Sequence, residues 1–186
     1  MVVIIVVVMV SGGFGGGSGS SDSASVSGDP VQAVTADTSG TYGDLVARAN
    51  DLYDKGNAEF QNQNFEQGGA YFAAAAKVYA AAWKKQPTDP GVGTDYAVAL
   101  FYSGDIESAL KQIDVVLKAE PEFQKGWLNK GIFLSHEARI LEQNGDTKQA
   151  KKLTEQAKAA FTEAVAIDPK SEAGQQADAS LQQLSQ

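Results

Sequence analysis

The chain has 186 residues, a formal net charge of −8 and no cysteine. Its length allows one compact domain with extensions. The acidic balance argues against a nucleic-acid surface, because phosphate binding depends on clustered lysine and arginine, and the lack of cysteine excludes disulfides, thiol nucleophiles and thiolate metal sites.

The chain opens with an uninterrupted apolar run, MVVIIVVVMV, at residues 1–10. Ten helical residues rise only about 15 Å, whereas a bilayer core needs about 20 residues. A secretory signal would require basic residues before such a run, and none precedes it here. We interpret it as the remainder of a membrane anchor or signal whose beginning is missing; the alternatives are a hydrophobic tail that is cleaved or disordered and a strand that has no partner.

Residues 11–43 have the composition of a flexible Gly/Ser-rich linker. Its glycine run lacks the Gly-Lys-Ser/Thr ending of a phosphate-binding loop. Arg48 is the first basic residue, and four aspartates precede it. Because cytoplasmic flanks of membrane segments are normally rich in lysine and arginine, we expect a membrane-anchored protein whose folded domain is extracytoplasmic. A cytoplasmic location is the alternative.

Residues 44–186 show helical periodicity that is interrupted by turn residues and prolines. The last predicted helix has few apolar residues, which is typical of the polar cap that a repeat array needs at its end. The expected helices are Asp44 to about Gln63, Phe65 to about Lys85, Pro90 to Ser103, a fourth that ends at Pro121, Pro121 to about Gln143, Asp146 to Ile167, and a capping helix from about residue 170 to 185.

Three similar units recur along this region. Ala97 precedes Pro121 by 24 residues, Gly56 precedes a proline by 31, and Gly131 precedes Pro169 by 38. These intervals differ by seven, and seven residues are close to two helical turns, so that such an insertion lengthens a helix without rotating its buried stripe. Ala97 and Gly131 are 34 residues apart. A period of this size built from helix pairs indicates a stacked helical array.

The pattern resembles the tetratricopeptide-repeat (TPR) family over roughly residues 44–171. The third unit matches best, and the second has Ala97 where glycine is usual. The matching residues of the third unit are Trp127, Gly131, Leu134, Gly145, Asp146, Ala150 and Pro169. The resemblance implies an all-α helical-hairpin repeat array (α-solenoid) with three repeats, two of them elongated, and a C-terminal capping helix. We expect a bacterial, membrane-tethered member of this family.

The residues present assemble no catalytic site. His136 is the only histidine, so a histidine-dependent metal site or a Ser-His-Asp arrangement would lack partners. Acidic residues occur at spacings typical of solvated helical faces, and no calcium-loop pattern is present. The sequence therefore predicts a non-enzymatic protein without a cofactor or a metal.

In TPR proteins the first helix of each pair lines a concave groove that holds a peptide or a partner helix. The groove positions of the pattern fall here on Asn50, Tyr53, Asn57, Phe60, Thr94, Val98, Phe101, Tyr102, Lys125, Leu128, Ile132 and His136. The family also has a clamp for a peptide carboxylate. Of that clamp this chain keeps Asn57, Lys125 and Asn129 but has Tyr53 and Asp95 where lysine and asparagine are expected, which argues against a chaperone-tail binder.

The resemblance implies a scaffold or adaptor that binds a protein or peptide partner. The apolar and aromatic groove set suggests an amphipathic or apolar segment as the partner. Two alternatives stay open: the groove residues belong to the core, or the same surface joins copies of a self-assembling structural protein.

Overall fold

The structure, a computed structural model, describes residues 31–185. The predicted anchor at residues 1–10, and residues 11–30 of the predicted linker, lie outside this range. Seven α-helices and no strand occur within it. None of these helices is both long and apolar enough to cross a bilayer.

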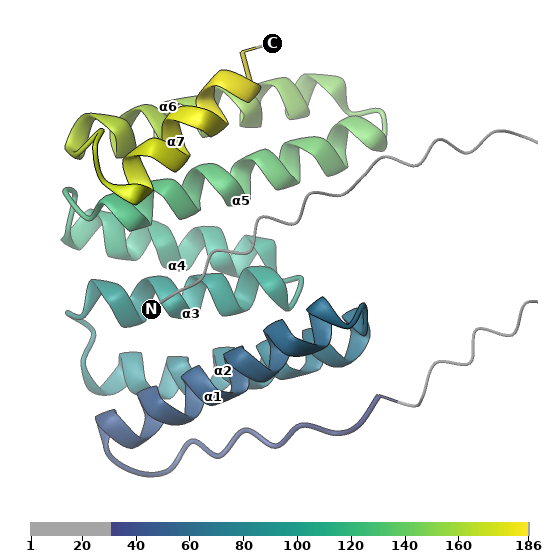
Figure 1. The fold of residues 1–186 in the computed structure, drawn as a ribbon, viewed down its shortest axis with the longest axis vertical. Helices are drawn as coiled ribbons and strands as arrows, with labels where there is room; N and C mark the ends of the chain where they lie inside the picture. Colours follow the sequence, from purple (N-terminus) through teal and green to yellow (C-terminus); the bar gives the residue numbers. More distant parts are fainter. Residues whose placement is uncertain (1–30, 186) are drawn as a thin grey trace, which may run out of the picture. The chain divides into compact units, whose positions relative to one another are not determined.

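Six of the helices form three successive hairpins, and the seventh follows them. In Figure 1, α1, α3 and α5 lie in a front layer, and α2, α4 and α6 lie behind them. This arrangement confirms the predicted fold class, a helical-hairpin repeat array. The helices are α1 (Tyr42–Gln61), α2 (Phe65–Lys85), α3 (Pro90–Tyr102), α4 (Ile106–Ala119), α5 (Gln124–Gln143), α6 (Thr147–Ile167) and α7 (Glu172–Gln183).

The three hairpins are closed by the same kind of turn. Each turn has one residue in the left-handed region: Gln63 at φ 64°, Gly104 at φ 91° and Gly145 at φ 87°. In each turn this residue donates its N–H to the carbonyl three residues back, and the next residue donates to the carbonyl five residues back, over 2.9–3.0 Å. These two bonds are those of a Schellman motif, which satisfies the last carbonyls of the first helix.

Helix lengths confirm that two of the three hairpins are elongated. The helices of the middle hairpin, α3 and α4, have 13 and 14 residues. Those of the outer hairpins have 20 and 21 residues in both cases. Every outer helix is thus seven residues longer, which is about two turns and keeps the buried stripe on the same side.

The extra turns lie at opposite ends of the two long hairpins. Gly56 packs on the Phe72 ring and Gly131 on the Phe161 ring. Gly56 lies five residues before the end of α1, as Ala97 does in α3, whereas Gly131 lies 12 residues before the end of α5. The first hairpin is therefore extended at its open end, and the third is extended beside its connecting turn.

Three helices begin at other residues than the sequence predicted, although α6 differs by only one residue because Asp146 is its N-cap. α1 begins at Tyr42, because Thr41 and Asp44 form a reciprocal capping box in front of it. α5 begins at Gln124 rather than Pro121, because the Phe123 N–H bonds the Glu120 carbonyl at 3.0 Å and closes a separate turn first.

Residues 31–41 lie against the first hairpin, although the sequence predicted a flexible linker up to residue 43. Gln32 exchanges two hydrogen bonds with Gln67, of 2.6 and 3.2 Å. The Arg48 guanidinium donates to the backbone carbonyls of Asp37 and Ser39, at 2.7 and 2.9 Å. Val34 is one of two apolar side chains from this segment that pack on the core. These contacts extend the folded domain beyond its predicted start.

The last helix caps the third hairpin, and Gln124 ties it in place. The Gln124 amide donates to the carbonyls of Ala164 and Asp168, both at 2.7 Å, and accepts from the Ser171 hydroxyl at 2.7 Å. Ser171 in turn accepts from the Gly174 N–H as the N-cap of α7. This matches the predicted capping helix.

Replacing Gln63 with glycine should stabilise the protein, because glycine adopts the left-handed conformation without the steric penalty that a side chain carries. We expect the free energy of unfolding to rise by about 0.5–1 kcal/mol, measured by denaturant titration. The control is Ala58→Gly, at an exposed position inside α1, which should lower the free energy of unfolding by about 1 kcal/mol. A loss of stability in both variants would contradict this account of the turn.

Gly174→Ala should loosen α7 from the third hairpin. An added Cβ at this position would lie 2.0 Å from the Asp168 carbonyl oxygen, and backbone cannot move aside as a side chain can. We expect a loss of about 2 kcal/mol or more in unfolding free energy and faster amide exchange in α7. The control is Gly69→Ala in α2, where a Cβ meets nothing within 4 Å, and which should be neutral or stabilising. Equal effects of both substitutions would exclude the clash.

Candidate functional site

The surface formed by α1, α3 and α5, here called the odd-helix face, carries the twelve predicted groove residues. Four of the twelve are core residues instead. The exposed fractions are 9% for Tyr53, 4% for Thr94, 5% for Val98 and 0% for Leu128. The structure buries these four side chains, because α3 packs on α2, α4 and α5, and α5 packs on α4, α6 and α7. Tyr53 of α1 packs on the Phe72 ring, with ring centroids 5.1 Å apart.

The other eight residues keep some exposure. Asn50 accepts a hydrogen bond of 2.6 Å from the Tyr79 hydroxyl. Asn50 and Lys125 are exposed, and the remaining six are half-buried: Asn57, Phe60, Phe101, Tyr102, Ile132 and His136. The accessible part of the predicted site is therefore an aromatic and polar surface spread over three helices.

Four rings on this face form a chain of contacts from α1 to α5, here called the aromatic row. Ring centroids are 6.1 Å apart between Phe60 and Tyr102, and 5.3 Å apart between Tyr102 and Phe101. Phe101 then meets His136 at 5.1 Å. All three contacts are edge-to-face, an arrangement favoured by ring quadrupoles. The row is supported from below by Phe72, which stacks on Tyr102 at 5.0 Å.

His136 is the member of the row that lies on α5. Burial, and next the Arg139 guanidinium, lower the pKa of its imidazole. Arg139 also lies 3.1 Å from the ring nitrogen Nδ1. Both effects favour the neutral imidazole over the imidazolium. Within residues 31–185 no group of three or more His, Asp or Glu side chains could hold a metal ion.

Asp95 is a partly buried ionisable group on the odd-helix face. Burial raises the pKa of its carboxyl to about 6, against the opposing charge of Lys125. No hydrogen bond or ion pair joins Asp95 to another residue in the described part of the chain. Asp89, six residues earlier in the chain, does have hydrogen-bond partners. It is the N-cap of α3, and it accepts a hydrogen bond of 2.6 Å from the Tyr42 hydroxyl.

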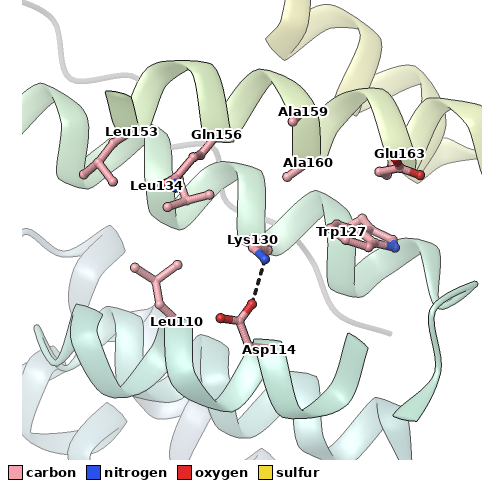
Figure 2. Close-up of a pocket in the computed structure, with 10 residues that line it drawn as sticks. All are labelled: Leu110, Asp114, Trp127, Lys130, Leu134, Leu153, Gln156, Ala159, Ala160 and Glu163. Carbon is pink, nitrogen blue, oxygen red and sulfur yellow. Dashed lines mark ion pairs between the residues drawn. The ribbon is translucent and has the colours of Figure 1, made fainter. Parts of the chain in front are cut away.

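The structure also has a hollow that the sequence did not predict, between α4, α5 and α6. Its volume is about 460 Å³, and none of the twelve predicted residues lines it. Figure 2 shows Lys130 of α5 and Asp114 of α4 pointing toward one another there, in an ion pair of 2.7 Å. The Lys130 amine also lies 5.3 Å from the centre of the Trp127 ring. The hollow depends on how far α4 and α6 separate, which no local pattern encodes.

Asp95→Asn should stabilise the protein at neutral pH but not in acid. The folded pKa of about 6 exceeds the ordinary aspartate pKa of 3.8, so the stability contributed by the protonated carboxyl is fully present below pH 3.8 and is lost as the pH rises through 6. Asparagine does not ionise, so the stability of the variant should not fall in this pH range for the same reason.

The measurement is denaturant unfolding between pH 3.5 and 7.5. The advantage of the variant over the natural protein should grow between pH 4 and 6, to at most about 3 kcal/mol. Asp178→Asn, at an exposed aspartate of α7, should give a smaller advantage at pH 7.5. A difference for Asp95→Asn that stays constant with pH would refute the burial of its charge.

Comparisons with known proteins agree with this geometry. The tetratricopeptide repeat family model matches residues 72–127. The first TPR domain of human RPAP3 is 18% identical, with a TM-score of 0.51 over 75% of this chain and 91% of that one. The TPR domain of Sgt2 from Aspergillus fumigatus is also 18% identical, with a TM-score of 0.50 over 74% and 76%. No curated protein sequence matches the chain. The described helices therefore have a TPR-like fold.

Proposed function

We propose that this protein is a non-enzymatic scaffold or adaptor that binds a protein partner on the odd-helix face. The observation that carries the proposal is the aromatic row, which links α1, α3 and α5 through ring contacts of 5.1–6.1 Å. Half-buried aromatic side chains that are held rigidly by neighbours lose little conformational entropy on binding, and such residues dominate the energetics of protein interfaces.

The partner segment that suits this face is amphipathic or apolar. Ile132 and the rings offer apolar area, and Asn50, Asn57 and Lys125 border it with polar groups. Peptide recognition by helical grooves commonly combines apolar anchors with a polar rim. The formal charge of −8 favours a protein partner over nucleic acid.

Membrane tethering through residues 1–10 is part of the same proposal. The apolar run and the Gly/Ser-rich composition of residues 11–30 support it, as does the scarcity of basic residues before Arg48, which favours an extracytoplasmic domain. A cytoplasmic location is the alternative. Fractionation of cells that express the full chain, with and without residues 1–10, tests both.

Self-association is the second candidate function. Phe65 is 57% exposed and contacts Phe60 at 5.5 Å between ring centroids, so that it extends the aromatic row at the tip of the first hairpin. An exposed apolar surface of this kind can pair with a second copy. Sedimentation velocity of the full chain across a dilution series separates the two functions, because a persistent monomer rules out a structural assembly.

The double substitution Phe101→Gln and Ile132→Gln should remove partner binding, because it replaces apolar anchors by amides that keep their hydrogen bonds to water. Quantitative pull-down with the full chain should show a loss of tenfold or more in the captured partners. Circular dichroism and thermal unfolding establish that the variant is folded.

The matched control replaces two exposed apolar residues away from this face, Val115→Gln in α4 and Ile167→Gln at the end of α6. It should capture the same partners as the natural protein. Equal capture by the odd-helix variant and the control would remove this face from the account.

A further inference from the structure

Asp95 lies on α3 of the odd-helix face and interacts electrostatically with side chains of three other helices, α1, α2 and α5. The pKa of the Tyr79 hydroxyl on α2 is raised first by burial and next by the Asp95 charge. The pKa of the Tyr53 hydroxyl on α1 is raised first by burial, next by Tyr102 and then by Asp95. Lys125 of α5 acts on Asp95 from the other side. The carboxylate is thus within electrostatic range of side chains from both neighbouring hairpins. It is only partly exposed.

The charges around Asp95 favour a cation. Lys125 is the described basic side chain that acts on Asp95, and it is exposed, whereas Asp89 adds a second negative charge nearby. Asp54 also acts on the two tyrosines that flank Asp95. Asp89 is already bonded to two backbone N–H groups and to Tyr42. Asp95 has no such bonds in the described part of the chain, so its charge is available to a ligand.

We propose that the odd-helix face recognises a basic segment of its protein partner, in which a lysine or arginine side chain pairs with Asp95. This inference rests on the proposed function and specifies the chemistry of the partner. A partly desolvated carboxylate lowers the stability of the free protein, and a cation that pairs with it relieves that penalty only in the complex. Perturbed carboxyls of this kind occur often at functional sites.

The distance between Asp95 and Tyr102 along α3 determines the expected position of the basic residue in the partner sequence. Asp95 and Tyr102 are seven residues apart, so they lie on the same side of α3 about 10 Å apart. A partner in extended conformation covers that distance in about three residues. We therefore expect a lysine or arginine about three residues from an aromatic or branched apolar residue that contacts the aromatic row.

The surroundings of Asp95 also disfavour the opposite ligand. A peptide carboxylate placed here would lie beside Asp95 and near Asp89, and like charges in a partly desolvated site repel strongly. Among the described residues Lys125 opposes this repulsion, and its side chain is exposed, so that salt screens its charge. The site therefore selects cations over anions.

A displayed library of random 12-residue peptides, selected on the immobilised full chain, tests the proposal. Enriched sequences should contain lysine or arginine about three residues from an apolar residue. These peptides are then synthesised with a fluorophore, alongside versions that have glutamine in place of the basic residue, and their affinities are measured by fluorescence anisotropy. Asp95→Asn and removal of the basic residue should each weaken binding by tenfold or more, and the two losses should not add.

The matched control is Glu163→Gln, at an exposed carboxylate that lines the hollow on α6. It removes one negative charge elsewhere and should change affinity less than twofold, which excludes non-specific attraction to an acidic protein. Asp95→Lys should shift the selection toward peptides with aspartate or glutamate at the same position.

Each other outcome overturns the proposal in a distinct way. Selected peptides that lack basic residues, or whose affinity Asp95→Asn leaves unchanged, refute the cation site. If such peptides still lose binding to the Phe101→Gln, Ile132→Gln variant, the odd-helix face remains the binding surface and only its charge preference is wrong. If no peptide is enriched, or if neither set of substitutions matters, the proposed function fails as well.

Discussion

A glycine that faces a phenylalanine ring holds the two helices of each long hairpin together. A Cβ atom on Gly56 would lie 2.9 Å from the Phe72 ring, and one on Gly131 would lie 2.5 Å from the Phe161 ring. The missing side chain lets the ring fill the space between the helix axes. Because this contact sets how closely the helices approach, it also sets which side of α1 and α5 remains free to form the odd-helix face.

Whole-turn extension preserves that face. The outer helices exceed α3 and α4 by seven residues each, and a length change close to two turns leaves the glycine and its ring facing one another. The first hairpin gains its turns at the open end, where Asp37 and Ser39 accept hydrogen bonds from Arg48. The third gains them beside Gly145. The array can therefore vary in length while the middle hairpin presents α3 between two similar neighbours.

The odd-helix face combines two features that work against stability in the free protein. The aromatic row leaves apolar ring area in contact with water, and the partly buried carboxylate of Asp95 makes no hydrogen bond or ion pair with a described residue. Both costs decrease when a segment with an apolar residue and a basic residue covers the face. His136 contacts the Phe101 ring at 5.1 Å and the Arg139 guanidinium at 3.1 Å within the row.

The sequence alone determined the hairpins, their turns and their relative lengths, because these follow from local signals: Gly104-Asp105 and Gly145-Asp146 as breaks, prolines at fixed intervals, and alanines at helical spacing. The sequence did not distinguish the residues that line the odd-helix face from those that belong to the hydrophobic core. Thr94 and Leu128 occupy the same kind of helical position as Phe101 and Ile132, yet the first two are buried and the last two are half-exposed. Only the stacking of one hairpin on the next decided which of these residues are buried. The same non-local packing created the hollow beside Lys130 and left Asp95 without an ion pair among the described residues. The reason is that burial depends on how far neighbouring helices separate and not on the order of residues within any one helix.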